Sequence, residues 1–388
     1  MLDRRQVLGL FAAAGALATL GLPSLGRAGP KLAPRLIVVL LRGGMDGLHA
    51  VVPYGDPAYE HARGSLALPS SSVLDLDGTF GLHPALSPIA PWFAEGQLLP
   101  LHALGLPYQE RSHFDAQDVL DNGSDRPNGA RDGWLNRAMA ALPHSTGVSL
   151  GANVPLILRG SAPVLALDPN RRRAANDGLL DALDTLYGGD PDLQQALRMG
   201  RESLTLLPET APEGRRGSFG GRVIQTLANV TTHPEGATAV AIEVGGWDTH
   251  ANQGTTGGAL ARRLGGLAEG LVGLRTALGD AWDQTAVVVL TEFGRTISPN
   301  GTGGTDHGIG SAGFLLGGAV NGGRVHADWP GLSPKEQVGN RDLRATTDIR
   351  AVLAGVLRDH LGLDRRGIEA TLPGFSSTLA LPGLVRSA

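Results

Sequence analysis

The chain has 388 residues, of which 42% are hydrophobic and 18% charged, so it is suited to one large folded domain and lacks the composition of a disordered protein. Its net charge of −4, without a stripe of lysine and arginine, argues against nucleic-acid binding. The absence of cysteine excludes thiolate metal sites and a cysteine nucleophile, so any metal must be held by histidine and carboxylate side chains.

The N-terminal segment has the pattern of an export signal. Arg4 and Arg5 are adjacent, an uncharged Ala/Gly/Leu-rich run follows over residues 7–22, and small residues near Ala28 offer a cleavage point. The run is too short and too weakly apolar for a membrane span. We expect residues 1–28 to be a twin-arginine signal peptide recognised by the twin-arginine export machinery. The protein is then periplasmic or secreted, without stable membrane insertion after cleavage; the alternative is an uncleaved anchor.

Residues 29–388 are expected to form one α/β domain. Apolar, β-branched runs predict strands at Arg35–Leu41, Gln97–Leu104, Thr238–Val244, Thr285–Thr291 and Gly313–Val320. Helical patterns lie between or after them at Asp132–Leu142, Leu179–Leu207 (broken near Gly188), Gly220–Val230, Leu260–Leu278 and Thr347–Leu361. This alternation predicts a mainly parallel sheet with helices on both faces. The Pro- and Arg-rich region from about 147 to 233 is a possible insertion over the sheet edge.

Functional groups in open parallel sheets gather beyond the carboxyl ends of the strands. The segments after three predicted strands, together with a later glycine-rich loop, supply carboxylates and imidazoles: Asp46, Asp248, His250, Glu292, Asp306 and His307. Carboxylates crowded at one edge repel each other unless a cation or a proton lies between them. Carboxylate with neutral imidazole is a ligand set for zinc, manganese or iron, and its oxygen-rich part also suits magnesium or calcium. We therefore expect a divalent-metal site; the alternative is that each residue only caps a turn.

A serine at the start of a predicted helix is the candidate nucleophile. Ser112 lies within the segment Glu110–Asp115, which follows a proline turn and opens a helix. Free backbone N–H groups at a helix start favour an anionic ester. The alternative is that Ser112 is an ordinary N-cap.

Five motifs in order along the chain carry a resemblance to a known family: GGMDG at 43–47, ERSHFDA at 110–116, GGWDTH at 245–250, TEFGRT at 291–296 and GTDHG at 304–308. As a set they resemble an exported family catalogued as domain of unknown function 1501. More loosely, the pattern is similar to the alkaline phosphatase and sulfatase superfamily, whose fold has the same kind of sheet.

The resemblance implies a metal-dependent hydrolase of phosphate or sulfate esters with Ser112 as its nucleophile. The metal ligands that it implies are Asp46, Asp248, His250, Glu292 and His307. Arg111 and Arg295 would stabilise the oxygens of the ester, and His113 and Asp306 would orient ligating histidines. The cofactor would be a divalent ion (zinc, manganese, magnesium or calcium), and the substrate a small anionic ester or a sulfated or phosphorylated polymer.

One departure from the superfamily pattern keeps a second function open. The superfamily usually has Asp-His directly after the late strand, whereas here Glu292-Phe293 stands there and Asp306-His307 follows only after a loop. One metal site is then either incomplete or completed from that loop. The alternative function is a non-catalytic exported structural or carbohydrate-associated binding protein that keeps the fold.

Two other enzyme classes are disfavoured. Gly147–Gly151 fits the G-x-S-x-G pattern of serine hydrolases, but the run that follows, Val154–Leu158, predicts another strand instead of the helix that a nucleophile elbow needs. No G-x-G-x-x-G or P-loop pattern follows a predicted strand, which argues against a dinucleotide-dependent enzyme or an NTPase.

Overall fold

The computed structural model describes residues 33–143, 145–151, 153–169, 177–191, 193–194, 197–198, 200–201, 221–232 and 238–386. The predicted signal peptide lies outside these residues.

An eight-stranded sheet forms the centre of the described chain, with the order β11-β5-β10-β9-β1-β8-β6-β7. Its strands are β1 (Arg35–Arg42), β5 (Leu98–Gly105), β6 (Gly147–Leu150), β7 (Val164–Leu167), β8 (Ala239–Gly245), β9 (Thr285–Leu290), β10 (Ser311–Leu316) and β11 (Thr347–Asp348). Every pairing is parallel except the two that β10 makes with β5 and β9. The predicted mainly parallel sheet is confirmed, and each of its five predicted strands is present within a few residues of the expected bounds.

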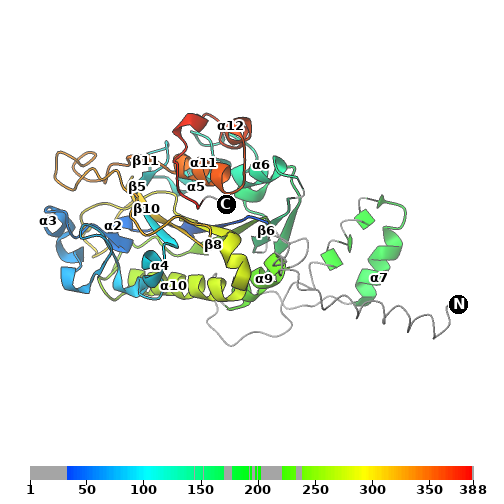
Figure 1. Ribbon diagram of the computed structural model, residues 1–388, viewed down its shortest axis with the longest axis horizontal. Coiled ribbons are helices and arrows are strands. Elements are labelled where there is room, and N and C mark those ends of the chain that lie inside the picture. Colours follow the sequence, from blue (N-terminus) through cyan, green and yellow to red (C-terminus); the bar gives the residue numbers. More distant parts are fainter. Residues whose placement is uncertain are drawn as a thin grey trace, which may run out of the picture. The chain divides into compact units, whose positions relative to one another are not determined.

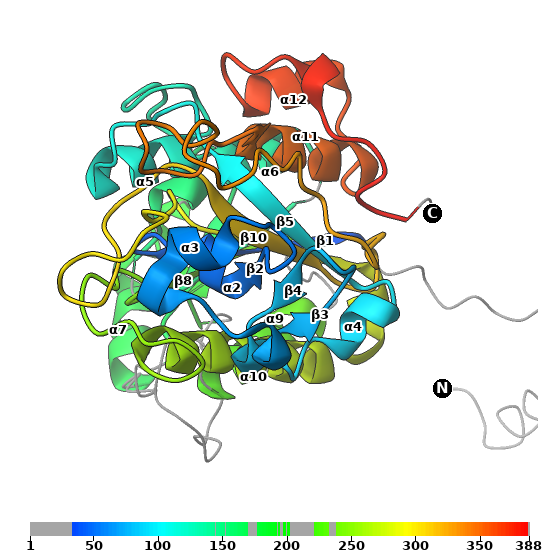
Figure 2. The same ribbon diagram turned by 90° about the vertical axis from the view of Figure 1, so that its left-hand side faces the viewer.

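Helices cover both faces of this sheet, as Figures 1 and 2 show. The side chains of β1 alternate between two cores: Leu36, Val38 and Leu40 belong to one, and Ile37 and its alternate neighbours belong to the other. The first core is closed by α5 (His113–Asn122), α6 (Trp134–Ala140), α11 (Ile349–Asp359) and α12 (Arg365–Thr371). The second is closed by α4 (Pro91–Ala94), α9 (Gly221–Thr232) and α10 (Ala259–Leu278). Because both faces are covered, the central strands are apolar throughout, and this made them recognisable in the sequence.

A smaller unit follows the first strand. It contains the three-stranded sheet β2-β4-β3 and the short helices α2 and α3, with bounds β2 (Val51–Val52), β3 (Leu74–Asp75), β4 (Gly81–Leu82), α2 (Gly47–Ala50) and α3 (Tyr59–Arg63). The 3-10 helices of the described residues occur both here and elsewhere in the chain. They are η1 (Gly64–Leu66), η2 (Ser70–Ser72), η3 (Pro84–Leu86), η4 (Leu156–Leu158), η5 (Gly279–Gln284) and η6 (Ser377–Leu379). The smaller sheet has no counterpart among the strands expected from the sequence, because its strands have only two residues each.

The region 147–233 differs from expectation in two places. The run Val154–Leu158 is not a strand: Leu156–Leu158 forms a 3-10 helix after Pro155. The strand lies earlier, at Gly147–Leu150, and pairs with β8. Ser149 lies within it and donates its hydroxyl to a nearby backbone carbonyl, so no nucleophile elbow forms there. Of the predicted helix Leu179–Leu207, the first part is present as α7 (Asp177–Leu186); residues 202–207 lie outside the described residues.

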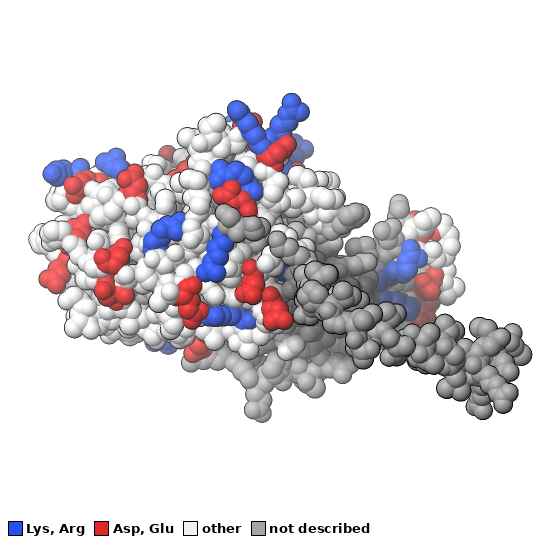
Figure 3. All heavy atoms as spheres, in the orientation of Figure 1, with Lys and Arg blue, Asp and Glu red and all other residues white. Residues whose placement is uncertain are grey.

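On the face drawn in Figure 3, acidic and basic side chains are interspersed and no single-sign patch stands out. Within the described part of the chain, no helix combines the length and the apolar character that spanning a membrane requires.

Buried His102 should make the stability of the fold depend on pH. Its Nδ1 accepts the N–H of Ala103 at 2.7 Å, and its Nε2 donates to the carbonyl of Val51 at 2.9 Å, so the buried ring is neutral. Burial lowers its pKa from 6.5 to about 4. Between these values the unfolded chain binds a proton that the folded protein does not, so stability falls as the pH falls. We expect a loss of roughly 3 kcal/mol from this group between pH 7 and pH 4.

Urea unfolding at a series of pH values measures this loss. His102→Gln should reduce the dependence, while other buried histidines such as His49 keep contributing, whereas His61→Gln, at an exposed position on α3, serves as the control. Equal pH dependence in the wild type and His102→Gln would show that His102 does not carry the effect.

Candidate metal centre

The central strands bring the carboxylates of Asp248 and Glu292, which are distant in the sequence, to one edge of the sheet. Strand β1 lies between β8 and β9, so the segments that follow these three strands meet. Gly43, directly after β1, donates its N–H to Glu292 Oε1 at 2.8 Å. Its φ is +124°, and a Cβ there would lie 2.5 Å from the backbone nitrogen of Asp248, so only glycine allows this approach. The segments that follow β1, β8 and β9 therefore pack closely against one another around the site.

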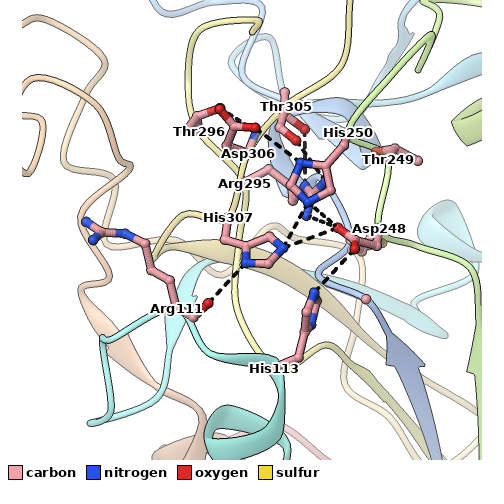
Figure 4. Close-up of polar contacts among 12 residues, drawn as sticks. Arg111, His113, Asp248, Thr249, His250, Arg295, Thr296, Thr305, Asp306 and His307 are labelled. Atoms are coloured by element: carbon pink, nitrogen blue, oxygen red, sulfur yellow. Dashed lines mark hydrogen bonds and ion pairs between the residues drawn. The ribbon is translucent and has the colours of Figure 1, made fainter. Parts of the chain in front are cut away.

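Three imidazoles converge on the carboxylate of Asp248 (Figure 4). His250 Nε2 lies 3.0 Å and His307 Nε2 lies 3.3 Å from Oδ1, and His113 Nε2 lies 3.5 Å from Oδ2. The Nε2 atoms of His250 and His307 are 3.0 Å apart. His113 begins α5, Asp248 and His250 follow β8, and His307 lies in the glycine-rich loop after β9. We refer to Asp248, His113, His250 and His307 as the histidine cluster.

The outer nitrogens of the three rings fix their tautomers. His113 Nδ1 lies 2.8 Å from Glu292 Oε1, and His307 Nδ1 lies 3.0 Å from the carbonyl oxygen of Arg111. His250 Nδ1 lies 3.1 Å from Asp306 Oδ1. A carbonyl oxygen and an ionised carboxylate can only accept, so in each neutral ring Nδ1 carries the hydrogen and Nε2 presents its lone pair. Three lone pairs and a carboxylate thus face one another.

This donor set fits a divalent metal ion. One ligand atom each from His113, Asp248 and His307 lies within 4.8 Å of the other two. Tetrahedral coordination with bonds of about 2.0 Å places ligand atoms about 3.3 Å apart. The distances from Asp248 Oδ1 to His250 Nε2 and His307 Nε2, 3.0 and 3.3 Å, lie close to that value, whereas His113 Nε2 approaches the other oxygen, Oδ2. The Nε2 of His113 is buried and makes no hydrogen bond to any described residue. Carboxylate or carbonyl partners on the outer nitrogens of ligating histidines are typical of metal sites.

The local charges keep the carboxylates ionised. Burial alone would raise the pKa of Asp248, but the hydrogen bond and charge of Arg295, 2.7 Å away, hold it below its ordinary value. Burial opposes ionisation of Glu292 as well, and hydrogen bonds from His113 and Gln117 lower its pKa instead. The hydrogen bond to Glu292 raises the pKa of His113, whereas burial lowers that of His307.

Neutralising Glu292 should weaken metal binding without unfolding the site. Its Oε1 accepts from Gly43 N, His113 Nδ1 and Gln117 Nε2 at 2.8–2.9 Å, and a glutamine oxygen can accept the same bonds. Glu292→Gln removes the charge that makes His113 a strong donor, so we expect affinity for zinc to fall about 10- to 100-fold. Competition against a chromophoric chelator measures it. Gln117→Met, which leaves the carboxylate on His113, is the matched control; equal affinity in Glu292→Gln and the wild type would contradict the role of Glu292.

Asp46 does not reach the histidine cluster in this structure. Its carboxylate is fully buried, and its Oδ2 accepts from Arg63 at 2.6 Å and from Gln253 at 2.7 Å. Burial acts to raise its pKa, but Arg63 overcomes this and holds it below its ordinary value. The guanidinium of Arg63 therefore supplies the positive charge that was expected from a metal beside Asp46. A second metal at this position does not fit these contacts.

Glu292 and Asp306 likewise contact the cluster from outside. Each accepts from the Nδ1 of a histidine in it, so both are placed to orient ligands. Glu292 thus lies outside the cluster, where His113 was expected, and His113 lies inside it. Asp248, His250 and His307 lie together in the cluster.

The two arginines assigned to the ester oxygens are engaged within the protein. Arg295 is buried, and it donates to Asp248 and to both the hydroxyl and the carbonyl of Thr305. Arg111 binds buried Asp342 through its guanidinium, which Figure 4 shows directed away from the cluster. Its φ is +61°, a conformation rare outside glycine, and its carbonyl accepts from His307. Both residues therefore hold cluster members in place, and a direct contact of Arg295 with substrate does not fit this structure.

Ser112 is the N-cap of α5, directly before His113. Its Oγ accepts from the backbone N–H of Asp115 at 3.5 Å, as the N-cap alternative predicts. Among the contacts of the described residues, none joins Ser112 to Asp46. Ser112 directly precedes the cluster residue His113 in the sequence, at a helix start, where the first backbone N–H groups have no acceptor within the helix.

The place of His113 in the cluster could have been inferred from its position at the start of a helix. It is the first residue of the helix that Ser112 caps, so its side chain lies at the same sheet edge as the ends of β8 and β9. Sequence spacing alone does not show this, because 135 residues separate it from Asp248 (248 − 113).

Comparisons with known proteins gave one family match and several distant structural similarities. Residues 89–367 match the family described as protein of unknown function (DUF1501). No match to the chain was found among curated proteins.

Three solved structures illustrate the structural similarities. The C-terminal periplasmic domain of EcEptC from Escherichia coli, in complex with Zn, is 10% identical with a TM-score of 0.36, over 75% of this chain and 74% of that one. Murine ectonucleotide pyrophosphatase/phosphodiesterase 5, an inactive variant in complex with AMP, is 10% identical with a TM-score of 0.29, over 68% of this chain and 57% of that one. Ps i-CgsB in complex with k-i-k-neocarrahexaose is 9% identical with a TM-score of 0.37, over 77% of this chain and 69% of that one.

Proposed function

The chain belongs to the DUF1501 family, and for this member we propose the function of an exported, metal-dependent hydrolase of phosphate or sulfate esters. One observation carries the proposal: the lone pairs of three imidazoles and the carboxylate of Asp248 face one another at the carboxyl edge of the sheet. The four side chains are between 24% and 46% exposed, so a ligand from solvent can reach them. A buried structural metal would not need such access.

The ligands favour zinc or another transition metal over magnesium or calcium. Three imidazole nitrogens and one carboxylate oxygen form a nitrogen-rich set, whereas magnesium and calcium prefer oxygen ligands. A bound divalent cation polarises an ester oxygen and stabilises negative charge that develops on it. The protein holds the ligands in place through Glu292, Asp306 and the carbonyl of Arg111.

Ser112 is the nucleophile in this proposal. Its Oγ forms a bond to phosphorus or sulfur while the bond to the alcohol oxygen breaks, and the leaving alcohol takes up the serine proton. Water then cleaves the serine ester, which restores Ser112 and releases phosphate or sulfate. The free N–H groups at the start of α5 and the dipole of this ten-residue helix favour the anionic ester at this position.

The surroundings of the cluster favour an anionic substrate. Arg341 and Arg111 are both partly exposed and share the buried carboxylate of Asp342, so the two guanidiniums carry one positive charge in excess. The hydrogen bond from Asn300 and then the hydrogen bond and charge of His250 lower the pKa of Asp306, and the charge of Arg341 adds the smallest contribution. A small phosphate or sulfate ester, or a phosphorylated or sulfated polymer, has the complementary charge.

Turnover of model esters tests the proposal. The purified protein, reconstituted with zinc or manganese, is assayed against p-nitrophenyl phosphate, bis-p-nitrophenyl phosphate and p-nitrophenyl sulfate. We expect hydrolysis of at least one, lost in Ser112→Ala without loss of bound metal. Equal activity in Ser112→Ala would exclude the serine as nucleophile. Bound metal without turnover of any ester would instead favour the non-catalytic binding protein.

A further inference from the structure

We propose that Gln253 is the positioning residue of the metal centre: its buried amide holds the two ligand-bearing segments at the separation that metal binding needs. This inference rests on the proposed metal site. Gln253 lies in the loop that leads from β8 to α10, five residues before the N-cap Gly258 of α10, and its side chain is fully buried. It does not touch the histidine cluster itself.

The amide joins three segments that are distant in sequence. Its Oε1 accepts from the hydroxyl of Thr249 at 2.8 Å and from that of Thr305 at 3.0 Å. Its Nε2 donates to Asp46 Oδ2 at 2.7 Å. Thr249 lies between the cluster residues Asp248 and His250, and Thr305 lies two residues before His307 (Figure 4).

The partners determine the orientation of the amide. Ionised Asp46 can only accept, so the NH₂ group faces it and the amide oxygen faces the two hydroxyls. Asp46 is in turn held by Arg63, which also donates to the carbonyls of Thr296 and Ile297. The buried ion pair thus anchors the amide, and this gives Asp46 a function that needs no metal at its side.

The network continues to Asp248 through Thr305. The Thr305 hydroxyl accepts from Arg295 Nε at 3.2 Å, and Arg295 donates to Asp248 Oδ1 at 2.7 Å. Backbone pairing already joins the two segments, since Thr305 N donates to the carbonyl of Thr249 at 3.1 Å. The side chain of Gln253 adds a fixed distance between Thr249 and Thr305, because its amide oxygen accepts from both hydroxyls. A buried polar group that loses its partners is destabilising, so we expect the two segments to shift when the amide is removed.

Zinc affinity tests the proposal, with fold stability measured beside it. Gln253→Leu is expected to lower the affinity for zinc alone at least about tenfold, in line with residues that support metal ligands without touching the metal. The matched control is Asn136→Leu, which removes a buried amide on α6 that bonds the carbonyls of Leu158 and Ala162. It should lower the melting temperature similarly and leave zinc affinity unchanged. Equal losses of zinc affinity in both variants would reduce the role of Gln253 to general stability.

A second pair of variants keeps the test valid where Gln253→Leu does not fold. Thr249→Val removes one hydroxyl on the amide with little change in volume, and Thr249→Ser restores that hydroxyl. We expect weaker zinc binding in Thr249→Val and recovery in Thr249→Ser. Wild-type protein that binds no zinc would overturn the proposed function itself. Wild-type protein that binds zinc no more tightly than Gln253→Leu and Thr249→Val would overturn only the role of Gln253.

Discussion

Replacing Asp248 with alanine is expected to reduce ester hydrolysis by at least about a thousandfold, because its carboxylate is the one cluster member that all three imidazoles approach. Loss of a metal that stabilises developing charge removes several kcal/mol of transition-state stabilisation, and about 4 kcal/mol corresponds to this factor. The rate is measured on the ester that the wild type hydrolyses best, at saturating zinc.

Two further variants separate loss of the ligand from loss of the fold. Asp248→Ala leaves the buried guanidinium of Arg295 without its carboxylate, so stability also falls. Asp248→Asn keeps an oxygen for that hydrogen bond and should fold while remaining inactive. Asp283→Ala, at an exposed position after α10, controls for loss of an acidic residue elsewhere. Activity within a few fold of wild type in Asp248→Asn would contradict its role as a ligand.

Asp46→Ala should lower the free energy of unfolding by about 3–5 kcal/mol, because it leaves the charge of Arg63 buried without a partner. Both side chains are essentially inaccessible to solvent, at 0% and 1% exposure, so water cannot replace the lost contact. Urea unfolding followed by circular dichroism measures the change. Asp125→Ala removes one partner of an exposed ion pair with Arg126, and this variant should cost less than about 1 kcal/mol.

A double variant provides a further test of the stability loss expected in Asp46→Ala. Asp46→Leu combined with Arg63→Met replaces both charges by apolar groups, and such replacements often cost less than removal of one partner. We expect the double variant to be more stable than Asp46→Ala. If Asp46→Ala were as stable as the wild type yet had lost its metal, Asp46 would be a ligand and not an anchor.

The sheet could be predicted from the sequence because its strands are buried on both faces. Runs such as the one over Arg35–Leu41 carry no polar interruption, so the pattern is strong without any knowledge of the partners. The reversed direction of β10 could not be predicted, because strand direction depends on how the chain returns and not on the residues of the strand. The strand at Gly147–Leu150 was missed since its glycine and serine weaken the β pattern.

The sequence indicated which residues lie near the site better than it indicated what each residue does there. Residues following β8 and in the glycine-rich loop were placed together correctly, because the carboxyl ends of parallel strands share one edge. Asp46 also follows a strand, but the side chain that meets it belongs to Arg63, seventeen residues later (63 − 46), in a helix that carries no motif. A buried cation and a metal ion satisfy a carboxylate equally well, and only the tertiary contacts show which is present.

Metal content of the purified protein tests the account most directly. Elemental mass spectrometry after reconstitution and removal of free ions should find about one divalent transition metal per chain in the wild type, and little in Asp248→Ala or His307→Ala. Retention of the full metal content by both variants would place the metal elsewhere. No bound metal in the wild type, even after reconstitution with zinc, manganese and iron, would contradict the metal centre and the hydrolase proposed from it.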